Sequence, residues 1–223
     1  MKHIAVLQYI TRPLRHLTWD EQVERACRCG FRWIQLRIKQ MPVEELTAIA
    51  QAARLITRRW NAQLIINDFP DVADKVGADG VHLGQQDGNP EAARRLLGAD
   101  ALIGLSAHNE EEVWRALSFQ PDYLGIGPYR FTATKSDLAP VLGAGGFARL
   151  TSLVHAHKPH VPVLAVGGVR AEDLPDILRA GGHGAAISSA ILFDGNESST
   201  VKELNSHLNQ QKLHELTAQA WNP

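Results

Sequence analysis

The chain has 223 residues, of which 44% are hydrophobic and 21% are charged, and its formal net charge is −1. This size fits one α/β barrel or one doubly wound sheet, and the composition is that of a globular enzyme. The near-neutral charge argues against nucleic acid as a partner, and the absence of an apolar run of about 18 residues argues against a membrane span.

Short apolar segments rich in Ile and Val recur along the chain and predict strands at 4–10, 33–38, 63–67, 80–83, 102–106, 123–127, 162–168 and 184–189. Between them, segments of helical periodicity predict helices at 18–30, 42–60, 90–98, 109–119, 146–157, 171–182 and 199–217. The first of these helices begins at a Thr cap and stops at a Gly. Its two cysteines, Cys27 and Cys29, do not face each other at this spacing, so we expect reduced thiols and a cytoplasmic protein.

Regular alternation of strands and helices indicates a parallel sheet, and the almost wholly apolar strands fit a sheet that is covered on both faces. We therefore predict a single (β/α)8 TIM barrel over residues 1–215, followed by a tail at 216–223. A doubly wound sheet is the alternative, because periodicity alone does not show that the sheet closes.

Polar side chains gather where the predicted strands end, which in a barrel is the mouth that holds the active site. In chain order they are Gln35, Arg37, Lys39, Asn67, Asp68, His82, Gln85, Asp87, Ser106, His108, Arg130, Thr132, Thr134, Lys135, Gly167, Gly168, Ser188 and Ser189. A single such residue is more often a solvated loop residue than a ligand, but so many around one mouth favour a site. For His82, inside its strand, packing or a hydrogen bond is the expected role.

Two carboxylates beside several cations suit Mg²⁺ and a diphosphate. Magnesium takes one or two carboxylates and fills its remaining positions with water and phosphate oxygens, so Asp68 and Asp87 are the candidate ligands. Arg37, Lys39 and Lys135 are placed to neutralise the diphosphate.

A second anion site is expected on the other side of the mouth. The loops after the seventh and eighth strands of this fold commonly hold a phosphate on glycine amides and a helix N-terminus. Gly168 would let a ligand approach the backbone, and Ser188 and Ser189 offer hydroxyl and amide donors.

From about residue 9 to about 192 the chain resembles the thiamine phosphate synthase (thiamine-phosphate pyrophosphorylase) family. The resemblance is carried by "QLRIK", "IINDFPDVADKVGADGVHLGQQD", "IGLSAHNEEE", "PDYLGIGPYRFTATK", "VLAVGGV" and "GHGAAISSAI", in this order. It implies a barrel enzyme that joins hydroxymethylpyrimidine diphosphate to thiazole phosphate, forms thiamine phosphate and releases diphosphate.

The resemblance also implies roles for individual residues. Asp68 and Asp87 would bind Mg²⁺. The pyrimidine diphosphate would be held by Gln35, Arg37, Lys39, Asn67, Ser106 and Lys135, and the thiazole phosphate by Thr132, Thr134, Gly168, Ser188 and Ser189. The family's displacement is thought to be dissociative, so catalysis would rest on stabilising the leaving group through Lys39, Lys135 and Ser106 rather than on a base or nucleophile.

The sequence departs from the family pattern at Ile38, Phe69, Arg12 and Arg130–Phe131. Ile38 should pack on the face opposite Arg37, and Arg130 could compensate for the cation missing at Phe69 if its loop folds over the mouth. The loop at 129–140 could act as a lid.

Three alternative functions stay open. The related thiazole tautomerase relies on a His where this chain has Pro128, and it lacks the metal-binding acids. A non-catalytic barrel that binds thiamine precursors and a generic phosphosugar enzyme are the others. The sequence leaves a homodimer open.

Overall fold

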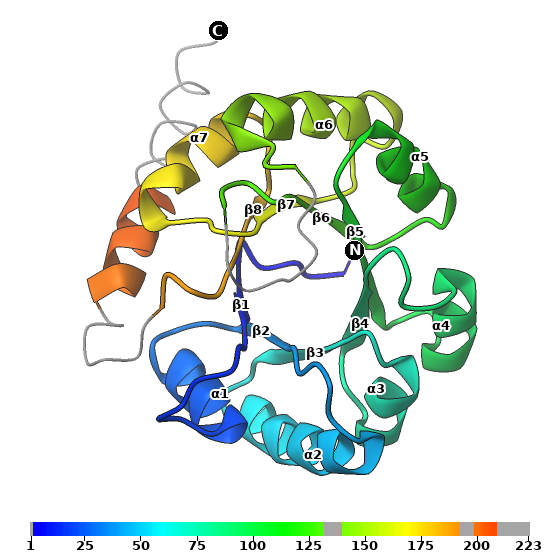
Figure 1. Ribbon diagram of the computed structural model, residues 1–223, viewed down its shortest axis with the longest axis vertical. Coiled ribbons are helices and arrows are strands. Elements are labelled where there is room, and N and C mark those ends of the chain that lie inside the picture. Colours follow the sequence, from blue (N-terminus) through cyan, green and yellow to red (C-terminus); the bar gives the residue numbers. More distant parts are fainter. Residues whose placement is uncertain (1, 132–139, 192–198, 209–223) are drawn as a thin grey trace, which may run out of the picture.

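The computed structural model describes residues 2–131, 140–191 and 199–208. Eight parallel strands form a closed barrel, and helices surround it (Figure 1). The strands are β1 (Leu7–Ile10), β2 (Trp33–Leu36), β3 (Gln63–Asn67), β4 (Gly80–Leu83), β5 (Leu102–Ala107), β6 (Tyr123–Ile126), β7 (Val163–Val166) and β8 (Gly184–Ile187). The helices are α1 (Trp19–Arg28), α2 (Val43–Arg59), α3 (Pro70–Val76), α4 (Pro90–Leu97), α5 (Glu110–Ser118), α6 (Gly143–His157), η1 (Ala171–Asp173) and α7 (Leu174–Arg179), followed by a helical segment at 199–208.

The pairing of β1 with β8 decides between the two predicted architectures. Leu7 lies opposite Ala185 and Tyr9 opposite Ile187, while β1 also pairs with β2 on its other side. A doubly wound sheet would leave two edges, so the predicted TIM barrel is confirmed. The predicted boundary between barrel and tail, at residue 215, lies outside the described residues.

Local sequence signals account for the helix boundaries. Thr18 caps α1 in a capping box with Glu21, as its sequence predicts. The predicted helix at 171–182 is instead split into η1 and α7, and α7 carries a Pro in its first turn. The predicted strand at 33–38 ends at Leu36, so Arg37 and Lys39 belong to the loop that follows β2.

The inside of the barrel is filled by side chains, as in other barrels of this size. At one end a cluster of Trp33, Ile65, Leu102, Tyr123 and Leu164 closes the interior. The rings of Trp33 and Tyr123 meet edge to face with centroids 4.8 Å apart. Trp33, Leu102 and Tyr123 are the first residues of their strands, so the carboxyl ends of the strands lie at the other end of the barrel.

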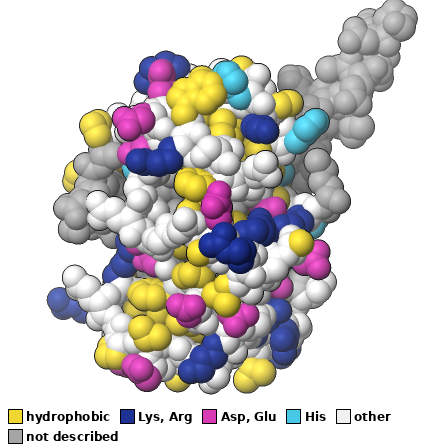
Figure 2. All heavy atoms as spheres, turned by 90° about the vertical axis from the view of Figure 1, so that its right-hand side faces the viewer, with side chains coloured by type: hydrophobic (Ala, Val, Ile, Leu, Met, Phe, Trp, Pro, Cys, Tyr) yellow, Lys and Arg dark blue, Asp and Glu magenta, His cyan; other side chains and the backbone are white. Residues whose placement is uncertain are grey.

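Figure 2 shows one face of the molecular surface. Acidic and basic side chains are interspersed over the face that bears α4 and α5 (Figure 2). Within the described ranges, no helix is both long and apolar enough to cross a membrane.

Candidate active site

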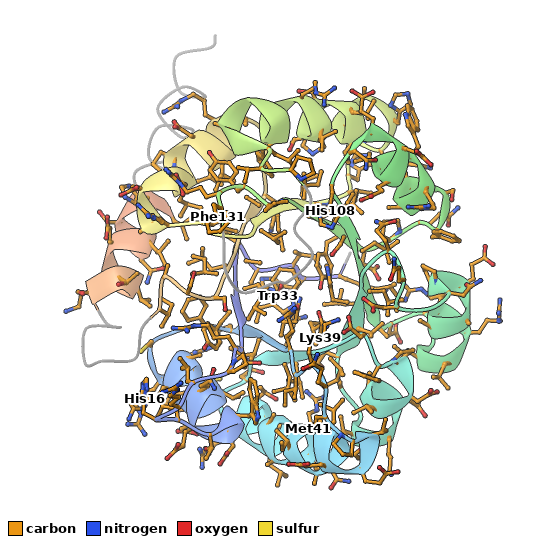
Figure 3. All side chains as sticks on the ribbon, viewed as in Figure 1. His16, Trp33, Lys39, Met41, His108 and Phe131 are labelled. Atoms are coloured by element: carbon orange, nitrogen blue, oxygen red, sulfur yellow. The ribbon has the colours of Figure 1, made fainter. Side chains whose placement is uncertain are left out.

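Three charged side chains from successive loops meet at the barrel mouth. Lys39 follows β2, Asp68 follows β3 and Asp87 lies beyond β4. The Lys39 Nζ forms an ion pair with Asp68 Oδ2 and lies 3.9 Å from Asp87 Oδ1. Lys39 lies over the interior of the strand ring, whereas Met41 lies out over α2 (Figure 3). The structure thus brings together the cation and the two acids that the sequence predicts for the diphosphate site.

The backbone holds both acids in place. Asp68 has a φ of 69°, a left-handed conformation that is uncommon outside glycine, and its N–H donates to the His82 carbonyl at 2.9 Å. Asp87 Oδ2 accepts a hydrogen bond of 2.8 Å from the Gly84 N–H. Strained backbone of this kind persists only where its surroundings fix it, and it is common at functional sites.

The electrostatics of the acid pair favour a cation. Burial, together with the hydrogen bond to Asp87, raises the pKa of Asp68 to about 6. Burial also opposes ionisation of Asp87, but its hydrogen bonds with Asp68 and the Gly84 N–H, and the charge of Lys39, lower its pKa overall. Two adjacent carboxyls that cannot both ionise freely would be stabilised in their charged forms by a bound cation.

Arg37 lies beside this pair. Burial lowers its pKa, and the charges of Asp68 and Asp87 oppose that shift. The side chain is half-buried, while its neighbour Ile38 is 2% exposed. The expectation that Ile38 packs in the core is confirmed, and Arg37 lies near enough to the acids for their charges to act on it.

Deeper in the mouth lie Gln35, Asn67 and Ser106, all of them buried. Gln35 Nε2 donates to Gln8 Oε1 at 3.1 Å, and Ser106 Oγ lies 2.9 Å from His82 Nε2. The Asn67 Nδ2 is buried without an acceptor among the described residues. A buried donor of this kind is costly unless water or a ligand satisfies it.

The second predicted anion site is only partly described. Ser188 and Ser189 follow β8 directly, Ser188 half-buried and Ser189 exposed. Thr132, Thr134 and Lys135 lie outside the described residues, as does most of the predicted lid at 129–140.

At Gly168 another segment of the chain comes close to the backbone. Gly168 has a φ of 69°, and a Cβ there would lie 2.7 Å from the Phe131 carbonyl oxygen. The lack of a side chain at Gly168 therefore leaves room for the backbone of Phe131.

Arg130 does not compensate for Phe69. Its guanidinium is bound to the Asp173 carboxylate, with Nε at 3.0 and 2.9 Å from the two oxygens. Asp173 is 4% exposed and also accepts from the Arg170 N–H. The predicted role of Arg130 over the acids is thus wrong, because η1 supplies a nearer carboxylate.

Two polar residues of the barrel interior, Gln8 and Tyr123, are not predicted from the sequence. His82, expected to pack or hydrogen-bond, joins them in a buried network through Tyr123. His108, which also follows a strand, instead contacts the Gly127 backbone and lies across the ring from Lys39 (Figure 3). A polar Gln inside an otherwise apolar strand was the available signal for this network.

Comparison with known proteins identifies the family of the chain. The family described as thiamine monophosphate synthase matches residues 7–191. A thiamine-phosphate synthase of Bacteroides thetaiotaomicron is 41% identical over 207 residues, covering 93% of this chain and 98% of the relative. One from Azorhizobium caulinodans is 42% identical over 171 residues, 77% of this chain and 78% of the relative.

A solved structure is also similar. The thiamine phosphate pyrophosphorylase from Pyrococcus furiosus superposes with a TM-score of 0.78 at 29% identity, covering 92% of this chain and 96% of that one. Fold, family match and relatives agree, and the chain belongs to the thiamine monophosphate synthase family of transferases.

Proposed function

We propose that this chain joins 4-amino-2-methyl-5-hydroxymethylpyrimidine diphosphate to 4-methyl-5-(2-phosphoethyl)thiazole, giving thiamine phosphate and diphosphate. The observation that carries the proposal is the convergence of Lys39, Asp68 and Asp87 at the mouth of the barrel. A site of two acids among cations suits a substrate that brings a diphosphate and a metal ion together.

Mg²⁺ is the cofactor that we propose for the acid pair. Among the described residues, no group of three or more His, Cys, Asp or Glu side chains is arranged to hold a metal. Two carboxylates are nevertheless enough for magnesium, which takes its other ligands from water and phosphate. Asp68 and Asp87 would hold the ion, and the ion would supply charge to stabilise the departing diphosphate.

The surrounding residues would act on the same leaving group. Lys39 and Arg37 provide positive charge at the mouth, and Lys135 is proposed to add to it. Asn67 and Ser106 offer neutral donors, and the unsatisfied Asn67 Nδ2 gives the diphosphate a ready partner. Gln35 is placed deeper, where it would contact the pyrimidine ring end of the substrate.

The reaction needs no protein base. A neutral thiazole nitrogen carries its own lone pair, and the aminopyrimidine stabilises positive charge at its methylene carbon as the C–O bond to diphosphate breaks. The new C–N bond then forms at that carbon. The protein's contribution is positioning and charge stabilisation, with Gly168, Ser188, Ser189, Thr132 and Thr134 proposed to hold the thiazole phosphate.

The test is thiamine phosphate formation from both purified substrates, with and without Mg²⁺, on wild type, Asp87→Asn and Asp74→Asn. Asp87→Asn keeps an oxygen for the Gly84 N–H but removes the charge, so we expect activity to fall by about 10²–10³-fold and Mg²⁺ binding, measured by titration calorimetry, to weaken. Asp74 is exposed on α3, so its variant controls for the loss of one acid.

Each other outcome has a meaning. Turnover without Mg²⁺, or full activity of Asp87→Asn, contradicts the metal assignment. Substrate binding without any product favours the non-catalytic barrel. We also propose that the protein is cytoplasmic and that its substrates are small molecules. The sequence leaves a homodimer open, and sedimentation analysis tests whether it forms.

A further inference from the structure

A series of hydrogen bonds runs through the barrel interior and ends at Ser106. Gln35 Nε2 donates to Gln8 Oε1 at 3.1 Å, and Gln8 Nε2 donates to the Tyr123 hydroxyl at 3.5 Å. The Tyr123 hydroxyl lies 3.1 Å from His82 Nδ1, and His82 Nε2 lies 2.9 Å from Ser106 Oγ. All of these side chains are at most 7% exposed. We call this series the interior chain.

The two amide bonds of the interior chain have a fixed direction, and one tautomer of His82 continues that direction to Ser106. The Tyr123 oxygen accepts from Gln8, so its own proton is available for His82 Nδ1. Burial raises the pKa of Tyr123 well above its usual value, so the phenol keeps that proton. A neutral histidine that accepts at Nδ1 carries its proton on Nε2, because the bond at one ring nitrogen sets the tautomer. His82 would then donate to Ser106 Oγ.

This direction has a consequence for Ser106. A hydroxyl whose oxygen already accepts a hydrogen bond directs its own proton to another acceptor, and that bond strengthens the donor. Ser106 is the penultimate residue of β5, at the same mouth as Asp68 and Asp87. An anionic ligand in the mouth is the acceptor that this geometry suits.

We propose that Tyr123 and His82 are positioning residues that fix Ser106 as a hydrogen-bond donor to the leaving diphosphate. The interior chain transfers no proton. It only orients the hydroxyl proton of Ser106. The inference rests on the proposed function, in which Ser106 contacts the diphosphate.

The backbone is shaped around the two rings of the interior chain. A Cβ at Gly104 would lie 2.1 Å from Tyr123 Cζ, and one at Gly125 would lie 3.2 Å from His82 Cε1. Glycine is unfavourable inside a strand unless something must come close to it. The Tyr123 ring is therefore packed against β5 and the His82 ring against β6, in addition to their hydrogen bonds.

The kinetic test is a double-mutant cycle with Ser106→Ala and Tyr123→Phe. Ser106→Ala removes the donor, so kcat should fall by about 10²–10³-fold. Tyr123→Phe keeps the ring but no longer directs Ser106, so kcat should fall by about ten-fold with little change in the thiazole KM. Because Tyr123 acts through Ser106, the double variant should lose no more than Ser106→Ala alone.

A structural role would give a different result. If Tyr123 only supports the fold, the fold-losses of kcat in Tyr123→Phe and Ser106→Ala should multiply in the double variant. That result would overturn the proposal. Tyr9→Phe is the matched control, since Tyr9 is equally buried and its hydroxyl donates to Gln22 Oε1 at 3.2 Å, away from Ser106. We expect Tyr9→Phe to keep the wild-type kcat.

The second test needs no turnover. In ¹⁵N-histidine-labelled wild type, the ring shifts of His82, assigned by their loss in His82→Gln, should show the neutral Nε2–H tautomer. An Nδ1–H tautomer or an imidazolium overturns the proposal. Wild type that makes no thiamine phosphate would instead refute the proposed function while leaving the tautomer measurement valid.

His82→Gln also provides a rescue. Its amide can donate to Ser106 from a position near that of Nε2, so we expect it to retain more activity than His82→Leu, which has no donor. Equal activities of these two variants would contradict a positioning role for His82.

Discussion

Lys39 and Asp68 form an ion pair at the barrel mouth, between the loops that follow the neighbouring strands β2 and β3. The lysine side chain stays 46% exposed, whereas the aspartate side chain is 9% exposed. The buried member is thus the acid, and the cation can reorient toward solvent. Lys39 can therefore exchange its bond to Asp68 for one to a bound diphosphate without crossing the barrel.

Replacing Lys39 should affect the chemical step more than folding. We expect Lys39→Ala to reduce kcat by about 10²–10³-fold, since it removes one charged contact to the leaving group. Lys39→Arg should keep part of the rate, because it preserves the charge but changes the geometry. Steady-state kinetics of both, with the exposed Lys75→Ala as control, give the measurement. Wild-type kcat in Lys39→Ala would contradict the assignment.

The sequence predicts the barrel and most of this mouth for a physical reason. Apolar segments of strand length set the order of the strands, and parallel strands place their carboxyl ends on one side. Asp68 and Asp87 could therefore be paired from sequence. Strand ends were predicted less well, since Arg37 and Lys39 follow β2 rather than belong to it.

Interactions inside the barrel could not be predicted in this way. The contact between Gln8 and Tyr123 depends on the register of strands that are far apart in sequence, and periodicity does not give register across the barrel. The bond between Arg130 and Asp173 was missed for a related reason. A long charged side chain can reach several acids, and only the fold shows which one is nearest.

Asn67→Leu should separate binding from stability. The buried Nδ2 has no partner among the described residues, so its removal should leave the free energy of unfolding unchanged or raise it by about 1 kcal/mol. The same change should raise the KM for the pyrimidine diphosphate, because the ligand loses a donor. Urea denaturation and steady-state kinetics measure the two effects. A large loss of stability together with an unchanged KM would show that Asn67 is a structural residue.

Gly104 and Gly145 should respond to alanine in opposite directions. A Cβ at Gly104 would overlap Tyr123, so Gly104→Ala should destabilise the fold by about 3 kcal/mol. Gly145 lies in α6 with nothing within 4 Å of its added Cβ, so Gly145→Ala should stabilise by about 0.5–1 kcal/mol. Denaturant unfolding of both variants checks the pair. Equal effects of the two substitutions would contradict the packing described around Tyr123.

The stability of the protein should fall in alkaline solution. Burial raises the pKa of Cys27 to about 12 from its usual 9.0, and also raises those of Tyr9 and Tyr123. Above pH 9 the unfolded chain loses these protons while the folded chain keeps them, so the unfolded state binds fewer protons and the free energy of unfolding decreases as pH rises.

The contribution of Cys27 can be isolated by substitution. We expect urea unfolding of wild type to show a decline between pH 8 and about pH 10.5, and Cys27→Ala, although less stable at pH 8, to show a smaller one. Cys29, which is only half-buried, supplies the control, because Cys29→Ala should keep the wild-type decline. A slope that is the same in Cys27→Ala as in wild type would mean that the buried thiol does not set the alkaline stability.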